Sequence, residues 1–167
     1  MVAEIRASCT DPSMRVIAGF SGGVDSTTAA AIVSPVLGDR LHCIIIDAGH
    51  LREGEVEEAM AHAKAAGVKL HVIKAEDRFF RALCGVEDSE LKRKIFGGLY
   101  HAIFLEEVAK FGATHMLQGT LATDLIESGA TGGAVIKTHH NVGHDWGALG
   151  HLEPLSALFK YEVRALA

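Results

Sequence analysis

Short apolar runs rich in β-branched residues alternate along the chain with longer stretches rich in alanine, glutamate and lysine. The apolar runs predict strands at 15–20, 41–46, 69–74 and 114–118, and a shorter one at 151–153. The longer stretches predict helices at 24–36, 53–66 and 89–111, the last with Gly112 placed to cap its end. We therefore expect an α/β fold with a five-stranded parallel sheet and helices on both faces, as in Rossmann-like domains.

Two segments depart from this alternation. Asp11 and Pro12 interrupt the first residues, so we expect residues 1–14 to be a loose lead-in to one domain at 15–167. Residues 130–150 contain five glycines and three histidines with no clean period. Such a long irregular segment is typical of a functional loop or of disorder. The last residues, LFKYEVRALA, predict a helix without a stop signal, as if the chain ended inside a larger protein.

Composition narrows the classes of function. The chain has 167 residues, 49% hydrophobic and 22% charged, which suits one domain with a substantial core. A net charge of −5 and few aromatic residues argue against a nucleic-acid partner. No apolar run approaches the roughly 20 residues that cross a bilayer, and no signal-peptide stretch opens the chain. We therefore expect a cytoplasmic protein with no membrane partner.

The residues SGGVDS, from Ser21 to Ser26, follow the first predicted strand and open the first predicted helix. Glycines at 22 and 23 let a phosphate approach main-chain N–H groups, and a helix N-terminus favours an anion. Asp25 repels phosphate unless a divalent cation lies between them, so it implies Mg²⁺. The lysine of a GxxxxGK[ST] loop is missing. From these residues alone, a phosphate site and a plain strand-to-helix turn are equal alternatives.

Several ordered motifs carry a resemblance to a known family. SGGVDST after a strand resembles the PP-loop of the N-type ATP pyrophosphatases, which include GMP synthase, NAD synthase and argininosuccinate synthase. GTLATDLIESGATGGAVIKTHHNVG, at residues 119–143, is similar to the GMP synthase pattern. LREGEVEE, KRKIFG and LEPLSALFKYEVRAL resemble the same family in the same order, whereas NAD synthases lack the IKTHHN stretch. The resemblance to the synthetase part of GMP synthases covers nearly all of the chain after Met14.

This resemblance implies an adenine nucleotide alpha hydrolase-like fold and a ligase reaction. The expected activity is adenylation of xanthosine monophosphate by MgATP with release of pyrophosphate, followed by displacement of AMP by ammonia to give GMP. The expected partners are these small molecules, a glutaminase subunit or domain that supplies ammonia, and a second copy of the chain. The family's glutaminase and dimerisation domains are not within these 167 residues.

The same resemblance implies roles for individual residues. Asp25 and Lys137 are expected to be catalytic, Asp25 as the Mg²⁺ ligand and Lys137 as a charge that closes over the leaving pyrophosphate. The expected ATP and pyrophosphate site consists of Ser21, Gly22, Gly23, Val24, Asp25, Ser26, Thr27, Ile46, Asp47, Tyr100, Gly119 and Lys137. The expected acceptor side consists of Asp124, Glu127, His139 and His140.

Ordinary structural interpretations stay open for these residues. Lys137 is alternatively a solvated surface charge, Asp47 a turn former before Gly49, and Tyr100 a helix core aromatic. The alternative for the acidic pair at 124 and 127 is a solvated helix face, and for the adjacent histidines at 139 and 140 a partly buried structural role. A metal site at these histidines is a poor interpretation, because no cysteine lies at ligand spacing.

The chain departs from the GMP synthase pattern at three places. Ala48 stands where the family has asparagine, Gly98 where it has arginine, and Ala122 with Thr123 where it has tyrosine and proline. All three replace side chains able to contact nucleotide with smaller ones, and none touches the PP-loop. Two other functions therefore stay open. One is a PP-loop enzyme with another acceptor, such as an amide or a tRNA base; the other is a catalytically silent ATP-binding module.

Overall fold

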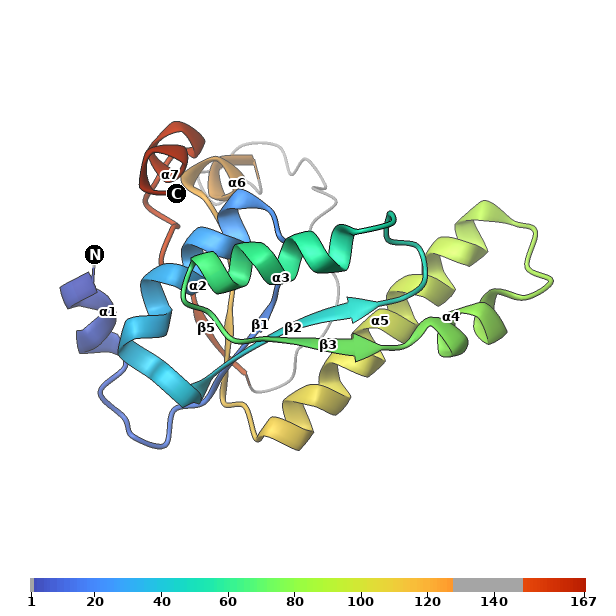
Figure 1. The fold of residues 1–167 in the computed structure, drawn as a ribbon, viewed down its shortest axis with the longest axis horizontal. Helices are drawn as coiled ribbons and strands as arrows, with labels where there is room; N and C mark the ends of the chain where they lie inside the picture. The colour runs from blue at the N-terminus through green and yellow to red at the C-terminus, as the bar shows by residue number, and fades with distance from the viewer. Residues whose placement is uncertain (1, 128–148) are drawn as a thin grey trace.

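A parallel sheet is the centre of the fold. In the computed structural model, which describes residues 2–127 and 149–167, five parallel strands pair in the order β3-β2-β1-β4-β5 (Figure 1). The strands are β1 (Val16–Gly19), β2 (Leu41–Asp47), β3 (Leu70–Lys74), β4 (His115–Leu117) and β5 (Gly150–Leu152). Val16 of β1 pairs with Leu41 on one side and His115 on the other. The predicted five-stranded parallel sheet is confirmed.

Helices cover both faces of the sheet, as predicted (Figure 1). On one face lie α1 (Val2–Ser8), α2 (Val24–Leu37), α3 (Glu55–Ala65) and α7 (Lys160–Leu166). On the other face lie α4 (Glu76–Leu83) and α5 (Ser89–Phe111). A short turn of 3-10 helix, η1 (Gly38–Arg40), precedes β2, and α6 (Ala122–Glu127) follows β4. No helix in the described ranges is long and apolar enough to cross a membrane.

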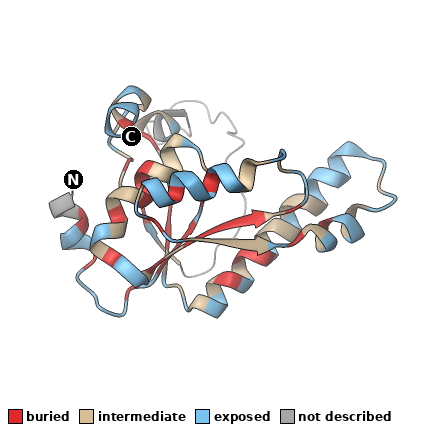
Figure 2. Cartoon of the chain, viewed as in Figure 1, coloured by how far each residue is buried: buried red, intermediate tan, exposed pale blue. Residues whose placement is uncertain are grey.

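Side chains alternate along the strands, and this makes both faces of the sheet apolar. Val16 and Ala18 of β1 lie in the cluster beneath α2 and α3, whereas Ile17 lies in the cluster beneath α4 and α5. Figure 2 shows the buried residues concentrated on the strands and on the inner sides of the helices. Cys43 of β2 is fully buried, and burial raises the pKa of its thiol to about 12. It is an inert core residue.

The ends of α5 follow the sequence signals. At its start, Asp88 Oδ1 accepts the Leu91 N–H at 2.7 Å, and at its end Gly112 takes a left-handed φ of 67°. The predicted bounds of this helix, 89–111, are confirmed. For the other strands and helices that the sequence predicts, the predicted first and last residues differ from those in the structure by one or two positions. Differences of this size are usual because the ends of helices and strands fray.

The first residues differ from the prediction. The expected loose lead-in at 1–14 is wrong, because α1 forms there and packs against α2. Ile5 and Cys9 are each only 4% exposed and join the core beneath α2. Their spacing, i and i+4, places them on one face of a helix. The turn signal at Asp11 and Pro12 outweighed this short apolar stripe in the prediction.

Helix α4 is absent from the prediction. Its residues Phe79, Phe80 and Leu83 recur at helical spacing, and Phe79 is 1% exposed and inside the core whereas Phe80 is 61% exposed. Arg78 joins α4 to α5 through two hydrogen bonds to the Glu106 carboxylate, at 2.7 and 2.8 Å. Tertiary contacts therefore add to a local pattern that is amphipathic but only eight residues long.

Candidate functional site

The predicted phosphate loop lies at the carboxyl edge of the sheet, between β1 and α2. The Phe20 N–H still pairs with the Ile44 carbonyl at 2.8 Å, so the chain leaves the sheet only after this residue. Gly22 then takes a left-handed φ of 73°, and Gly23 is the N-cap of α2. The loop thus occupies the position at which parallel sheets bind ligands.

The first turn of α2 leaves main-chain donors unused. Within the described residues, the N–H groups of Val24, Asp25 and Ser26 meet no acceptor. The helical ladder starts only with the Thr27 N–H, which donates to the Gly23 carbonyl at 3.0 Å, and no side chain of residues 2–127 or 149–167 caps the terminus. Three free N–H groups at the positive end of a helix form a binding site for an anion.

Hydroxyl groups surround the same turn. Ser21 Oγ lies 3.1 Å from Ser26 Oγ and accepts the Gly23 N–H at 3.3 Å. The Ser26 hydroxyl donates to the Gly23 carbonyl at 3.1 Å. Thr27 Oγ1 is buried and has no hydrogen-bond partner in the described part of the chain. Since an unpaired buried hydroxyl is costly, this group has bonding capacity left for a ligand.

Asp25 is the charged residue of the turn, and its two oxygens differ. Oδ2 accepts a hydrogen bond from Lys160 Nζ at 2.5 Å, whereas Oδ1 is buried without a partner among the residues described. Lys160 is the first residue of α7, and this helix start is fixed by Glu162 Oε2, which accepts the Phe159 N–H at 2.8 Å.

Lys160 is not among the residues predicted for the site. A signal for it exists in LFKYEVRAL, because a lysine at the first position of a helix opposes the helix dipole. A residue type that is unfavourable at its position in a helix is often found at a functional site.

The end of β4 closes the site from another side. A Cβ on Gly119 would lie 3.3 Å from Asp25 Cβ and 3.4 Å from the Asp25 carbonyl carbon, closer than ordinary contact. Glycine is needed here because the chain leaving β4 passes directly against the start of α2. The structure therefore brings together two residues, Gly119 and Asp25, that the sequence assigns to one site.

Three further residues of the predicted ATP site lie on β2 and α5. Asp47 ends β2, and its Oδ1 accepts the Gly49 N–H at 2.9 Å, which is a turn-forming contact. Ile46 is buried and Tyr100 half-buried, both in the cluster beneath α4 and α5, and burial raises the pKa of the Tyr100 phenol. These contacts are structural, and a role of the three residues in ATP binding stays a prediction.

A cavity of about 420 Å³ opens beside the turn at the end of β2. Its walls include Ala48, Gly49, Lys92 and the rings of Phe79 and Phe96. The smaller side chain of Ala48, one of the departures from the family pattern, therefore lines space next to the predicted adenosine region.

The predicted acceptor side is described only in part. Asp124 is the third residue of α6, and its Oδ2 accepts the Leu121 N–H at 2.9 Å, so one carboxylate oxygen caps the helix. Glu127 is the last residue of α6, and its side chain lies outside the described part of the structure. Lys137, His139 and His140 also lie outside the described residues, and their roles stay predictions.

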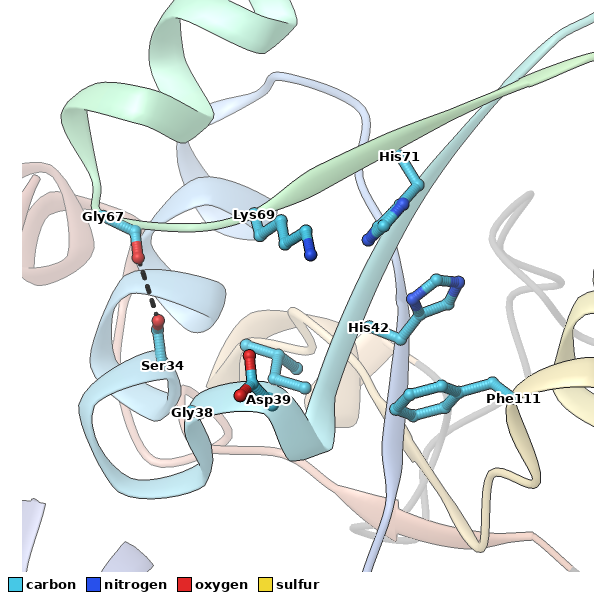
Figure 3. Close-up of a pocket in the computed structure, with 9 residues that line it drawn as sticks. Ser34, Gly38, Asp39, His42, Gly67, Lys69, His71 and Phe111 are labelled. Atoms are coloured by element: carbon cyan, nitrogen blue, oxygen red, sulfur yellow. Dashed lines mark hydrogen bonds between the residues drawn. The ribbon is translucent and has the colours of Figure 1, made fainter.

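A larger cavity, of about 650 Å³, lies at the opposite, amino edge of the sheet (Figure 3). In it the ring of His42 stacks on Phe111 with centroids 4.6 Å apart and lies 4.4 Å from the ring of His71. Ser34 Oγ donates to the Gly67 carbonyl at 3.0 Å across its rim. None of the predicted site residues lines this cavity. The larger cavity therefore lies away from the predicted site residues, which gather at the carboxyl edge.

Comparisons with known proteins show the family of the chain. The sequence model of the NAD synthase family matches residues 5–95, which include the phosphate loop. The chain belongs to the NAD synthase family. The chain is also 47% identical to the glutamine-hydrolysing GMP synthase of Aquifex aeolicus, over 99% of this chain and 33% of that protein. It is 45% identical to one subunit of the glutamine-hydrolysing GMP synthase of Pyrococcus horikoshii, over 99% of this chain and 53% of that relative.

Solved structures agree with the fold of this family member. The NH3-dependent NAD synthetase of Campylobacter jejuni superposes with a TM-score of 0.67 at 15% identity, over 99% of this chain and 68% of that one. The NMN synthetase of Francisella tularensis gives 0.68 at 16% identity, over 99% and 65%. These confirm the fold, and the GMP synthase relatives confirm the resemblance that the motifs indicated. The chain spans between a third and about half of the length of these curated relatives.

Proposed function

We propose that this chain is the ATP-pyrophosphatase part of a GMP synthase. In this function it adenylates xanthosine monophosphate with MgATP, releases pyrophosphate and leaves the adenylated purine for amination to GMP. The observation that carries the proposal is the turn at residues 22–26, where three unpaired N–H groups, Asp25 and Lys160 converge. Relatives at 45% and 47% identity, which are named GMP synthases, support the same assignment.

The turn contributes binding, orientation and charge stabilisation. The N–H groups of Val24, Asp25 and Ser26 match the oxygens of the leaving pyrophosphate. As O2 of xanthosine monophosphate bonds to the α phosphorus, the bond from that phosphorus to the bridging oxygen breaks, and its electron pair leaves with pyrophosphate. The reaction needs no protein nucleophile, so holding the reactants in line and stabilising the departing charge account for the catalysis.

Lys160 adds a positive charge to this turn. Its side chain is 40% exposed and already pairs with Asp25, so its flexible stem allows the ammonium group to reach a phosphate oxygen beside the carboxylate. We also propose Lys137 as a second lysine that closes over the pyrophosphate, as the motif IKTHHN implies.

The donor set of the turn fits Mg²⁺. Asp25 Oδ1 is buried and unpaired within the described chain, and a carboxylate oxygen is a ligand that Mg²⁺ prefers alongside phosphate oxygens and water. When bound, Mg²⁺ supplies neutralisation of the charge on the phosphates. Asp25 would hold the ion, and the unpaired N–H groups of α2 would hold the phosphates.

The remaining parts of the reaction are proposed from the family motifs. The 420 Å³ cavity next to Ala48 offers apolar walls to the adenine ring of ATP, close to Asp47 and Tyr100.

Asp124, Glu127 and the histidines at 139 and 140 form the acceptor side. A glutaminase subunit or domain supplies ammonia, in line with the name of the Pyrococcus relative, which is one subunit of its enzyme. We also propose that two copies of the chain pair, as the resemblance implies. Residues 15–167 form the catalytic domain, and the apolar side chains of α1 extend its hydrophobic core.

The test is pyrophosphate release from MgATP by the chain, with and without xanthosine monophosphate and ammonium. We expect release only with xanthosine monophosphate present, and a reduction of at least about a hundredfold in Asp25→Asn. Asp39→Asn, just beyond the other end of α2, is the matched control. ATP binding without release would favour a silent nucleotide-binding module, and release with another acceptor a different PP-loop enzyme. No binding of ATP would overturn the proposal.

A further inference from the structure

Helix α3 packs directly against the loop between β1 and α2. A Cβ on Gly22 would lie 3.3 Å from the Cβ of Ala59 and 3.4 Å from its Cα. His62 lies on the same face of α3 as Ala59, because residues at i and i+3 are neighbours on a helix. Its Nδ1 lies 3.2 Å from the Gly22 carbonyl oxygen. One face of α3 therefore meets the loop at two adjacent points.

The Gly22 carbonyl, as the partner of His62, determines which of the two groups donates the hydrogen bond. A carbonyl oxygen only accepts, so Nδ1 of His62 carries the proton in this contact. The neutral Nδ1–H tautomer and the charged imidazolium both satisfy this requirement. In the described part of the chain, no other donor reaches the Gly22 carbonyl.

We propose that His62 is a positioning residue that sets the direction of the peptide between Gly22 and Gly23. A trans peptide is planar, so its C=O and N–H point to opposite sides. With the carbonyl held on α3, the Gly23 N–H points toward Ser21 Oγ, at 3.3 Å, and toward the first turn of α2. A flipped peptide would present an oxygen to the anion site and repel phosphate. This inference rests on the proposed function, since it assumes that the loop binds phosphate.

Besides the contact to His62, the long hydrogen bond of the Gly23 N–H to Ser21 Oγ, at 3.3 Å, restrains this peptide. It joins two glycines, and the absence of Cβ atoms on both sides makes both orientations sterically accessible. A single hydrogen bond worth about 1 kcal/mol shifts such a two-state equilibrium roughly fivefold to tenfold. The apparent affinity for the anion equals the intrinsic affinity multiplied by the fraction of molecules whose peptide is correctly oriented. The contact to His62 therefore acts on binding through the orientation of this peptide.

The experiment compares His62→Leu with His62→Asn in the full chain, using calorimetric titration with magnesium pyrophosphate and, separately, with MgATP. Asparagine places an amide nitrogen the same number of bonds from Cα as Nδ1 and so restores the donor. We expect His62→Leu to weaken both affinities by about threefold to fivefold and His62→Asn to stay within about 1.5-fold of wild type. Ala61→Leu, at the exposed neighbouring position of α3, controls for an added leucine and is expected to bind normally.

Two results would overturn the inference: wild-type affinity in His62→Leu, or equal weakening in His62→Leu and His62→Asn. Binding is measured well below the melting temperature of each variant, so that a loss of stability is not mistaken for a loss of orientation. If the wild type binds neither ligand, the proposed function fails. If the wild type binds and His62→Leu matches it, only the role of His62 fails.

Discussion

The Lys160 ammonium group lies 2.5 Å from the Asp25 carboxylate, although 135 residues separate the two in the sequence. Their side chains are 40% and 32% exposed, so water screens the pair in part. An ion pair of this exposure commonly stabilises a fold by less than about 1 kcal/mol. It does hold a positive charge beside the unpaired N–H groups of α2. The pair is therefore better placed to serve ligand binding than folding.

We expect Lys160→Met to weaken pyrophosphate binding at least about tenfold and to change the free energy of unfolding by less than about 1 kcal/mol. The ammonium group gives a charge-assisted hydrogen bond to phosphate, which methionine cannot replace. Calorimetry and urea denaturation measure the two effects. Lys110→Met, which removes the partner of Glu107 on α5, is the control and leaves binding unchanged. A loss of stability without a loss of affinity would contradict the assignment.

Gly22→Ala tests the close approach of α3 to the loop. Gly22 and Gly85 have φ values of 73° and 74°, so alanine is strained equally at both. Only at Gly22 does the new Cβ meet a neighbour, 3.3 Å from the Cβ of Ala59. In urea denaturation we expect a cost of about 1 kcal/mol for Gly85→Ala and about 1 kcal/mol more for Gly22→Ala. Equal costs would show that the loop yields to the methyl group.

Gly98→Ala is expected to stabilise the protein. Gly98 lies inside α5, and a Cβ there meets nothing within 4 Å, so alanine adds helix propensity without a clash. The gain in the free energy of unfolding is about 0.5–1 kcal/mol. Thermal or urea unfolding measures it, with pyrophosphate affinity as the control that does not change. A destabilised variant would mean that the open space at Gly98 is filled in solution.

The sheet and most helices could be predicted because their signals are local. Cys43 and Ile44 face opposite core clusters, which is why β2 reads as a continuous apolar run. Asp88 and Gly112 mark both ends of α5 by residue type alone. By contrast, α4 is an amphipathic helix of only eight residues, and so short a pattern is a weak signal without the contacts that α4 makes with α5.

For the candidate site, the residues of the phosphate loop could be predicted from the sequence, but the residues that surround the loop could not. The segment SGGVDST contains the glycines and the carboxylate that a phosphate and a cation require, so the residues themselves point to it. Lys160 and His62 come from other helices, 135 and 40 residues from their partners Asp25 and Gly22. Their approach depends on how α7 and α3 pack on α2. No short-range pattern in the sequence encodes that packing.

His42, at the amino edge of the sheet, is expected to make the free energy of unfolding decrease as the pH falls. Burial, and after it the nearby charge of His71, lowers the pKa of His42 from its usual 6.5. A histidine with a lowered pKa in the folded state favours folding while it is neutral. Its contribution is therefore fully present above about pH 6.5 and is lost as the pH falls through the lower folded value.

We accordingly expect the free energy of unfolding to decrease as the pH is lowered from about 7 to about 5, and His42→Phe to flatten this decrease. Phenylalanine keeps a ring against Phe111 but cannot take up a proton. His151→Gln removes an exposed histidine and is expected to leave the slope unchanged. Glu106, whose pKa is lowered by its hydrogen bonds to Arg78, loses its contribution only below about pH 4.5, outside this window. Urea denaturation at a series of pH values measures the slope, and a slope that His42→Phe does not change would exclude His42 as its source.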